Sequence, residues 1–246
     1  KISGMEFADG LMAQLTNLGG EVTYGRGISA RKIDNGFEVC TEDGETYEGK
    51  NLIIASGAAH RHLGIEREQE LIGRGVSYCA VCDGPFFKEK TAAVVGGGSA
   101  ALQDALYLAG ICSKVYLIHR RDTFRAEKSL IDQVMVAENI ECVMESRVTA
   151  LIGEKKLTEL EVTNLSGEKK TLVADGLFVA IGMEPHNEVF RDLVDLDEAG
   201  YVIAGENCKT RTPGVYAAGD CRTKTVRQLT TAAADGTVCG LVCKAV

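Results

Sequence analysis

Residues 91–110, TAAVVGGGSAALQDALYLAG, pass from an apolar run through three glycines into a segment rich in alanine and leucine. The apolar run is typical of a buried β-strand, and the segment after the glycines is typical of an α-helix. Residues 114–121, KVYLIHRR, supply the next strand. The order strand, helix, strand predicts two parallel strands joined by a right-handed crossover, which is the basic unit of an α/β fold.

The glycines of this stretch form a phosphate-binding pattern, Gly96-x-Gly98-x-x-Ala101. A strand before it and a helix after it are the context in which the pattern indicates a dinucleotide site. Gly96 permits the tight turn, Gly98 lets the backbone approach a pyrophosphate, and Ala101 lets helix and strand pack closely. The helix N-terminus then faces the negative charge. A plain flexible turn is the alternative interpretation.

The end of the second strand favours NADPH over NADH. An NAD site has an Asp or Glu there for the ribose hydroxyls, whereas this chain reads HRRDTFRA at residues 119–126. Arg120, Arg121 and Arg125 form a cationic group, and guanidinium groups match the oxygens of a 2′-phosphate. The alternative is an ordinary solvated basic turn.

The rest of the chain continues the alternation of strands and helices. A helix is expected at residues 5–18, strands at residues 21–25 and 37–49 with a turn at Asp43-Gly44, and a buried strand in NLIIASG at residues 51–57. Further strands are expected at residues 139–146, 147–154, 157–167, 168–175, 176–182 and 212–218, and a last helix from residue 228. LIIASG and LFVAIG, about 125 residues apart, are both apolar strands that run into a glycine. We therefore predict an α/β protein with two Rossmann-like, three-layer dinucleotide-binding domains.

Composition excludes several classes of function. The chain has 246 residues, of which 45% are hydrophobic and 25% charged, with a formal net charge of −8. This acidic balance argues against a nucleic-acid or anionic-membrane surface. No apolar run approaches a membrane span, and the first residues lack the apolar centre of a secretory signal. The nine cysteines are mostly far apart, so a disulfide framework is not expected and the protein is predicted to be cytoplasmic.

Residues 77–84, SYCAVCDG, place Cys79 and Cys82 three positions apart with Asp83 behind them. A structural zinc needs four ligands, and the chain has no second C-x-x-C, while its histidines are scattered, so no metal is predicted. A pair of inert buried thiols remains an alternative. A dithiol that opens and closes is favoured, since cysteines at this spacing can lower one another's pKa and form a small ring reversibly. Asp83 is then within reach as a general acid or base, or it is only a turn carboxylate.

A dithiol beside an NADPH site requires an electron carrier between them. Hydride does not pass efficiently to a disulfide, so a group that accepts hydride and hands on electron pairs is expected, and a flavin fits. Gly219-Asp220 ends a strand where the carboxylate can take a ribityl hydroxyl. The following helix would direct its N-terminus at the pyrimidine edge of the flavin.

Five stretches, in order, resemble the low-molecular-weight bacterial thioredoxin reductases, which are class II pyridine nucleotide-disulfide oxidoreductases. They are SYCAVCDGPFF, VVGGGSAALQDALYLA, LIHRRDTFRA, LFVAIGMEP and TPGVYAAGDCRTKTVRQLTTAAADG. The similarity covers nearly the whole chain. It implies a flavoprotein oxidoreductase, active as a homodimer, that passes electrons from NADPH through FAD to a redox-active disulfide and on to thioredoxin, using two domains that rotate relative to each other.

The resemblance also implies roles for individual residues. Cys82 would face the flavin, Cys79 would attack the substrate disulfide, and Asp83 would be the acid. The implied FAD contacts are Ser56, Gly57, Gly219, Asp220, Arg227, Gln228 and Leu229. The implied NADPH contacts are Gly96, Gly98, Ser99, Ala101, His119, Arg120, Arg121, Arg125, Ile181 and Gly182.

By the same resemblance, an FAD domain comprises residues 1–61 and 201–246, and an NADPH domain carrying the cysteine pair comprises residues 62–200. The family begins with a strand and a G-x-G-x-x-G for the FAD pyrophosphate, and this chain begins after them. We therefore expect the FAD domain to be incomplete at its N-terminus and the chain alone to hold FAD weakly or not at all.

Two local departures from the family pattern concern the partner and the phosphate loop. Pro85 replaces the first aromatic residue after Cys-Asp-Gly, on the expected thioredoxin surface, and Ser99-Ala100 replace a more polar pair. Two alternative functions remain: a related peroxiredoxin reductase, and a non-catalytic NADPH-binding fragment. A second redox pair at Cys239 and Cys243 is less favoured than core or interface thiols on one helix face.

Overall fold

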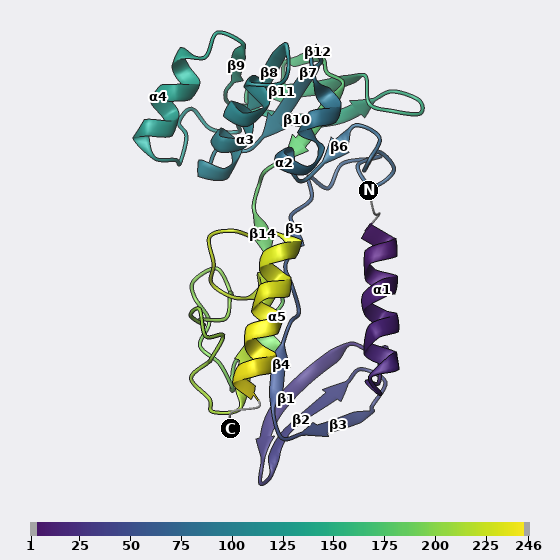
Figure 1. Cartoon of the computed structure of the whole chain (residues 1–246). Coiled ribbons are helices and arrows are strands. Elements are labelled where there is room, and N and C mark those ends of the chain that lie inside the picture. Colours follow the sequence, from purple (N-terminus) through teal and green to yellow (C-terminus); the bar gives the residue numbers. More distant parts are fainter. Residues whose placement is uncertain (1–3, 244–246) are drawn as a thin grey trace. The chain divides into compact units, whose positions relative to one another are not determined.

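The computed structural model describes residues 4–243 and divides the chain into two compact units (Figure 1). Unit 1 is formed by the chain up to Gly57 and again from Pro185 onward, and unit 2 runs from Ala58 to Glu184. Where the chain enters and leaves unit 2, β5 (Ala59–His60) pairs antiparallel with β14 (Met183–Glu184).

Both predicted domain limits therefore need correction. The first lies at 57/58 instead of 61/62, because residues 59–60 pair within unit 2. The second lies at 184/185 instead of 200/201. Leu193 and Val194 are buried in one cluster with Phe37 and Val215 of unit 1, so the segment from Pro185 to Gly200 belongs to that core.

Unit 2 is built on a five-stranded parallel sheet. Its order is β6 (Val76–Ser77), β13 (Gly176–Val179), β7 (Thr91–Val95), β8 (Lys114–Ile118) and β9 (Ile140–Val143). Helices α3 (Ser99–Ala109) and α4 (Lys128–Val136) make the crossovers. An antiparallel sheet of β10 (Ser146–Ile152), β11 (Glu159–Asn164) and β12 (Lys169–Val173) precedes β13.

Alternation along the strands places this sheet in the middle of three layers. Ala93 and Val95 of β7 belong to a core cluster shared with β10–β12, whereas Ala92 and Val94 belong to a second cluster shared with α3. Successive side chains of a strand point to opposite faces, so a continuous apolar strand is buried on both. The predicted β-α-β unit and its three-layer packing are confirmed here.

Unit 1 repeats this layering on a smaller scale. The strands β4 (Leu52–Ile54) and β15 (Val215–Ala217) form a parallel pair. Val215 and Ala217 pack toward the antiparallel sheet β1 (Gly27–Ile33), β2 (Gly36–Thr41) and β3 (Thr46–Gly49), while Tyr216 packs with Cys239 of α5 (Leu229–Cys243). Helix α1 (Gly4–Asn17) precedes these strands, as its apolar spacing predicts.

One predicted strand is wrong. Residues 21–25 form no strand, and the free edge of β2 is paired instead with β1, which starts at Gly27. The predicted turn at Asp43-Gly44 is confirmed between β2 and β3, where Gly44 has φ +86°. Among residues 4–243, no helix is long and apolar enough to cross a membrane.

Candidate active site

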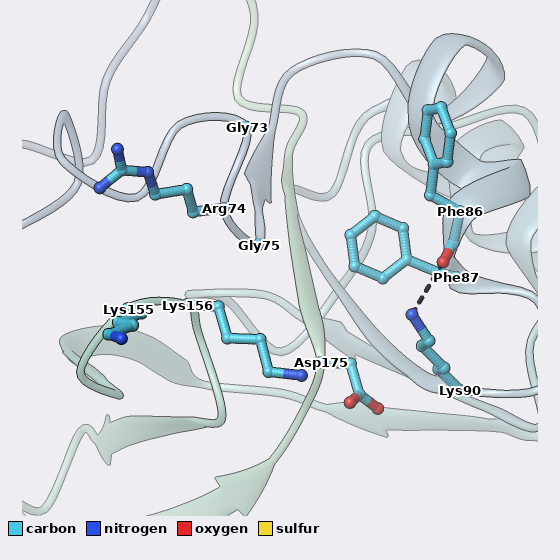
Figure 2. Close-up of a pocket in the computed structure, with 9 residues that line it drawn as sticks. All are labelled: Gly73, Arg74, Gly75, Phe86, Phe87, Lys90, Lys155, Lys156 and Asp175. Carbon is cyan, nitrogen blue, oxygen red and sulfur yellow. Dashed lines mark hydrogen bonds between the residues drawn. The ribbon is translucent and has the colours of Figure 1, made fainter.

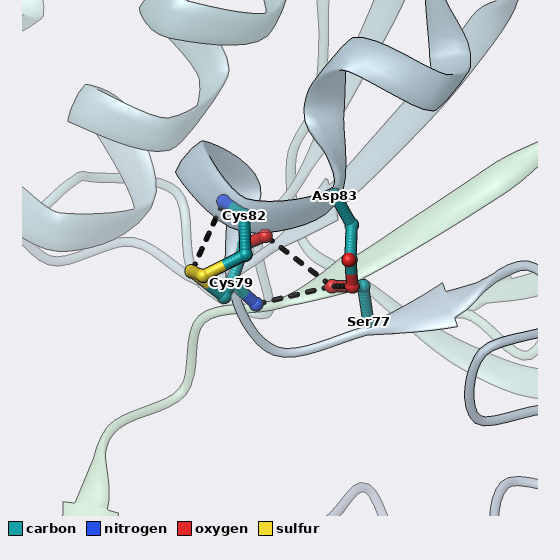
Figure 3. Close-up of a disulfide and its surroundings, with 4 residues drawn as sticks. All are labelled: Ser77, Cys79, Cys82 and Asp83. Atoms are coloured by element: carbon teal, nitrogen blue, oxygen red, sulfur yellow. Dashed lines mark hydrogen bonds between the residues drawn. A yellow bond between two sulfur atoms is a disulfide. The ribbon is translucent and has the colours of Figure 1, made fainter. Parts of the chain in front are cut away.

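Cys79 and Cys82 are joined in a disulfide at the start of the short helix α2 (Ala80–Asp83), shown in Figure 3. Cys79 has extended backbone and is the N-cap, and its Sγ accepts a hydrogen bond from the Cys82 N–H at 3.2 Å. Cys82 is exposed and Cys79 is half-buried. The pair is therefore accessible at the surface of unit 2, as a dithiol that exchanges with a protein substrate must be.

Ser77 connects the acid to this pair and was not singled out by the sequence. Its hydroxyl donates to Asp83 Oδ2 at 2.7 Å and accepts from the Cys79 N–H at 3.1 Å (Figure 3). Ser77 ends β6, the strand that leads into the cysteine turn, and it is 5% exposed. A buried hydroxyl thus fixes the direction of the Asp83 carboxylate relative to the Cys79 backbone.

A cavity of about 640 Å³ lies at the carboxyl ends of the strands in unit 2. Nine of the ten predicted NADPH residues line it: Gly96, Gly98, Ser99, His119, Arg120, Arg121, Arg125, Ile181 and Gly182. The tenth, Ala101, is fully buried in the core beneath the loop. The sequence did not single out Gly97, Arg61 and Arg147, which also line the cavity; only a basic charge marks the two arginines. In open α/β sheets, ligands bind at this end of the strands.

The backbone of the glycine loop is close to its neighbours on both sides. Gly96 has φ +155°, and a Cβ there would lie 2.4 Å from Ala180 O and 2.6 Å from Ala101 Cβ. A Cβ on Gly97 would lie 2.1 Å from the His119 ring. At Gly98 the nearest atom would be 3.9 Å away, so there is room for a ligand beside its backbone. This difference is what a phosphate-binding loop requires.

Positive charge surrounds His119 at the edge of this cavity. The ring packs on Phe124 with centroids 5.5 Å apart, and Nε2 lies 3.0 Å from Thr123 O. Burial lowers the pKa of His119, and the charges of Arg120, Arg121 and Arg125 lower it further. An anion such as a 2′-phosphate would be attracted to the same charges.

In unit 1, four of the seven predicted FAD residues lie at the ends of two paired strands, and the other three lie at or just before the start of α5. Ser56 and Gly57 follow β4, and Gly219 and Asp220 follow β15, and the parallel register joins Ile54 to Ala217. Arg227 lies 4.1 Å from the Tyr201 ring centroid and donates to Asp220 O at 3.4 Å. The Gln228 N–H donates to Thr231 Oγ1 at 3.1 Å at the start of α5, and Leu229 is exposed.

The carboxylate of Asp220 tests whether these residues fit a flavin. Among the residues that the structure describes, Asp220 Oδ1 is the one buried side-chain oxygen or nitrogen without a hydrogen-bond partner. A buried acceptor is normally satisfied, and an unsatisfied one requires an explanation. A ribityl hydroxyl would supply the missing donor, so the residues present fit FAD.

Asn187 is a polar residue of unit 1 that the sequence did not single out. It is fully buried, accepts a hydrogen bond from Ser56 Oγ at 2.8 Å, and donates to Gly200 O and Cys221 O. Its amide therefore holds the loop after β4 against the turn after β15. Because the predicted boundary placed it in the other domain, this role could not be inferred.

The fold and the two sites define a dinucleotide-dependent oxidoreductase with a redox-active disulfide. The family model of pyridine nucleotide-disulphide oxidoreductases matches residues 2–236. The chain is 39% identical over 243 residues to the thioredoxin reductase of Listeria innocua, covering 97% of this chain and 75% of that protein. It therefore belongs to the thioredoxin reductases of this family.

Two further relatives agree with this assignment. The chain is 40% identical over 237 residues to the bifunctional thioredoxin reductase/thioredoxin of Mycobacterium leprae, covering 96% of this chain and 52% of that protein. The crystal structure of the thioredoxin reductase from Streptococcus pyogenes superposes with a TM-score of 0.93 at 36% identity, covering 99% of this chain and 80% of that one.

Proposed function

We propose that this chain reduces a thioredoxin-type disulfide with electrons from NADPH, using Cys79 and Cys82 as the exchanging pair. The observation that carries the proposal is the accessible disulfide on the unit whose glycine loop faces an arginine-lined cavity. The M. leprae relative, a thioredoxin reductase fused to a thioredoxin, supports the partner. When bound, FAD would accept hydride from NADPH and deliver an electron pair to the disulfide.

The residues of the chain account for the exchange with substrate. In the reduced pair, the Cys79 thiolate attacks one sulfur of the substrate disulfide, and the other substrate sulfur leaves as a thiolate. Asp83, held by Ser77, would protonate that thiolate and then take the proton of Cys82. The Cys82 thiolate attacks the Cys79 sulfur, which releases the second substrate thiolate and restores the Cys79–Cys82 disulfide.

The assay that tests this function follows NADPH consumption with thioredoxin and a dithiol-reactive dye, in the presence of added FAD. We expect turnover that depends on thioredoxin. Asp83→Asn keeps the size of the side chain but has no transferable proton, so kcat should fall about 10²-fold. Asp132→Asn, a change in an exposed carboxylate of α4, is the matched control. An absence of thioredoxin-dependent turnover would instead support a non-catalytic nucleotide-binding protein.

A basic hollow of about 530 Å³ provides a docking surface for the protein substrate (Figure 2). It lies at the amino ends of the unit 2 sheet, since Gly75, Lys90 and Asp175 each directly precede a strand. The cationic side chains that line it are Arg74, Lys90, Lys155 and Lys156. Asp175 is its one lining carboxylate, and this group already accepts the Thr91 N–H at 3.1 Å.

The hollow is connected to the cysteines through one segment. Phe86 and Phe87 line the hollow and belong to the short helix η1 (Gly84–Phe87), which follows α2 directly. Pro85, the residue that departs from the family pattern, lies in the first turn of this helix. Phe86 is 68% exposed. A partner that extends from Cys82 along this segment would meet an exposed aromatic ring and a positive surface, which favours an acidic face on that partner.

Reversing two of these charges should weaken binding of the protein partner without affecting the reaction at the cysteine pair. In Lys155→Glu/Lys156→Glu, kcat/KM for thioredoxin should fall about three- to tenfold at low ionic strength, and less at high salt, because rim charges act mainly on the association rate. Turnover with a small dithiol-reactive dye should stay unchanged. Lys128→Glu, outside the hollow, is the control; equal losses in both variants would exclude the hollow as the docking surface.

The family resemblance alone supports a homodimer and a cytoplasmic location for the protein. Light scattering after size-exclusion chromatography tests the dimer, and fractionation of the source cells tests the location. A monomer at micromolar concentration would contradict the proposed homodimer.

A further inference from the structure

A cluster of buried charges lies in unit 1, apart from the cysteine pair. Its members are Asp235 on α5 and two cations that precede the helix, Arg222 and Lys224, whose side chains are 9%, 5% and 8% exposed. The Arg222 guanidinium makes a bidentate contact with this carboxylate: Nε donates to Oδ2 at 2.8 Å, and Nη2 donates to Oδ1 at 2.6 Å. Lys224 Nζ lies 2.8 Å from Oδ2.

Net stability is a poor explanation for such a cluster. Removing three charged groups from water costs free energy that their attraction only partly offsets. Burial opposes the ionisation of Asp235, but the hydrogen bonds from Arg222, Lys224 and the Gly219 N–H outweigh it and hold its pKa well below the usual range. Asp235 therefore stays ionised at neutral pH, and its main contribution is to orient the groups that donate hydrogen bonds to it.

Two of the groups that Asp235 orients belong to the turn after β15. The Gly219 N–H donates to Asp235 Oδ2 at 2.9 Å, and Gly219 has φ +76°, a conformation that favours glycine. Arg222, at the other end of the same turn, is bound to the same carboxylate and also donates to Ala204 O at 3.2 Å. One buried carboxylate thus ties both ends of residues 219–222.

Asp220 is the residue that this clamp positions. It lies between the two tied residues, and its Oδ1 is the buried oxygen without a partner in the described chain. Arg227 supports the same turn, because its guanidinium donates to Asp220 O and Arg222 O, each at 3.4 Å. A carboxylate placed to accept one hydroxyl loses affinity when its backbone can shift.

We propose that Asp235 is a positioning residue of the flavin site, which clamps Gly219 and Arg222 so that the Asp220 carboxylate meets a ribityl hydroxyl of FAD. The inference rests on the proposed assignment of Asp220 to FAD. It adds a residue on a different element, outside hydrogen-bond contact with Asp220 itself, and gives the ion cluster a role beyond packing.

The test measures FAD affinity of the flavin-stripped protein by fluorescence titration, and amide hydrogen exchange of residues 219–222 without FAD. Asp235→Asn keeps the shape but loses the charge and one acceptor. We expect FAD affinity to fall about tenfold or more and exchange of the turn to accelerate. Arg222→Lys keeps the charge but lacks the planar guanidinium that binds the carboxylate in a bidentate manner. It should lower FAD affinity and accelerate exchange as well, and it replaces Asp235→Asn if that variant folds poorly.

Arg211→Met is the matched control, since it removes an exposed ion pair of unit 1, with Asp195, and leaves every contact of Asp235 in place. Its FAD affinity should change less than about twofold. A folded Asp235→Asn or Arg222→Lys protein with wild-type FAD affinity and unchanged exchange would overturn the proposal. If the unaltered protein neither binds FAD nor shows thioredoxin-dependent turnover with added FAD, the proposed function fails instead, and hydrogen exchange alone then decides whether Asp235 clamps the turn.

Discussion

Thioredoxin-dependent turnover should fall more than about 10³-fold in Cys79→Ser, because the hydroxyl that replaces the thiol cannot form a mixed disulfide. The structure leaves no substitute nearby: the described cysteines outside the pair are buried or half-buried thiols, and burial raises the pKa of five of them. A thiol with a raised pKa supplies little thiolate. Steady-state NADPH consumption with thioredoxin measures the loss.

The companion variant Cys82→Ser separates the two thiols. Cys79 could still attack a substrate disulfide, but nothing would resolve the mixed disulfide, so a covalent adduct with thioredoxin should accumulate and be visible by mass. Cys40→Ser, a half-buried cysteine of unit 1, is the control and should keep full activity. Turnover in Cys79→Ser above a few per cent of wild type would disprove the proposed exchange pair.

The sequence predicted the fold best where local chemistry dictates it. The glycine loop at residues 96–98 requires close backbone contacts on both sides, so its three glycines and flanking strand are visible without coordinates. The wrongly predicted strand at residues 21–25 shows where a local sequence pattern is not sufficient. Alternation favours an extended segment, but a strand forms only where an edge is free to pair, and β1 occupies the edge of β2.

The site residues that sequence reasoning missed are those fixed by contacts between distant segments. Ser77 acts through Asp83 and Cys79, and Asn187 joins loops more than 130 residues apart. Asp235 acts on a turn that precedes its own helix. No local pattern marks such residues, because their roles depend on which strand ends the fold brings together. Motifs therefore predicted the groups proposed to touch ligands, and the structure was needed for the groups that hold them in place.

The largest change in cofactor choice should follow from Arg120→Ala/Arg121→Ala. Two guanidinium groups that bind a 2′-phosphate contribute about 1.5–3 kcal/mol each, so kcat/KM for NADPH should fall about 10²- to 10⁴-fold while that for NADH changes less than about threefold. Initial rates with both nucleotides measure the ratio. Arg74→Ala, an arginine of the same unit outside this cavity, should leave the ratio unchanged.

A second observable in this variant does not depend on turnover. Burial lowers the pKa of His119 and the nearby arginines lower it further, so removing two positive charges should raise that pKa toward its ordinary value. The shift is measurable by NMR titration of the ring protons. If the pKa of His119 rises but NADPH and NADH lose activity equally, Arg120 and Arg121 shape the local potential without reading the phosphate, and the preference for NADPH must come from Arg125 or from Arg147 of β10, both of which line the same cavity.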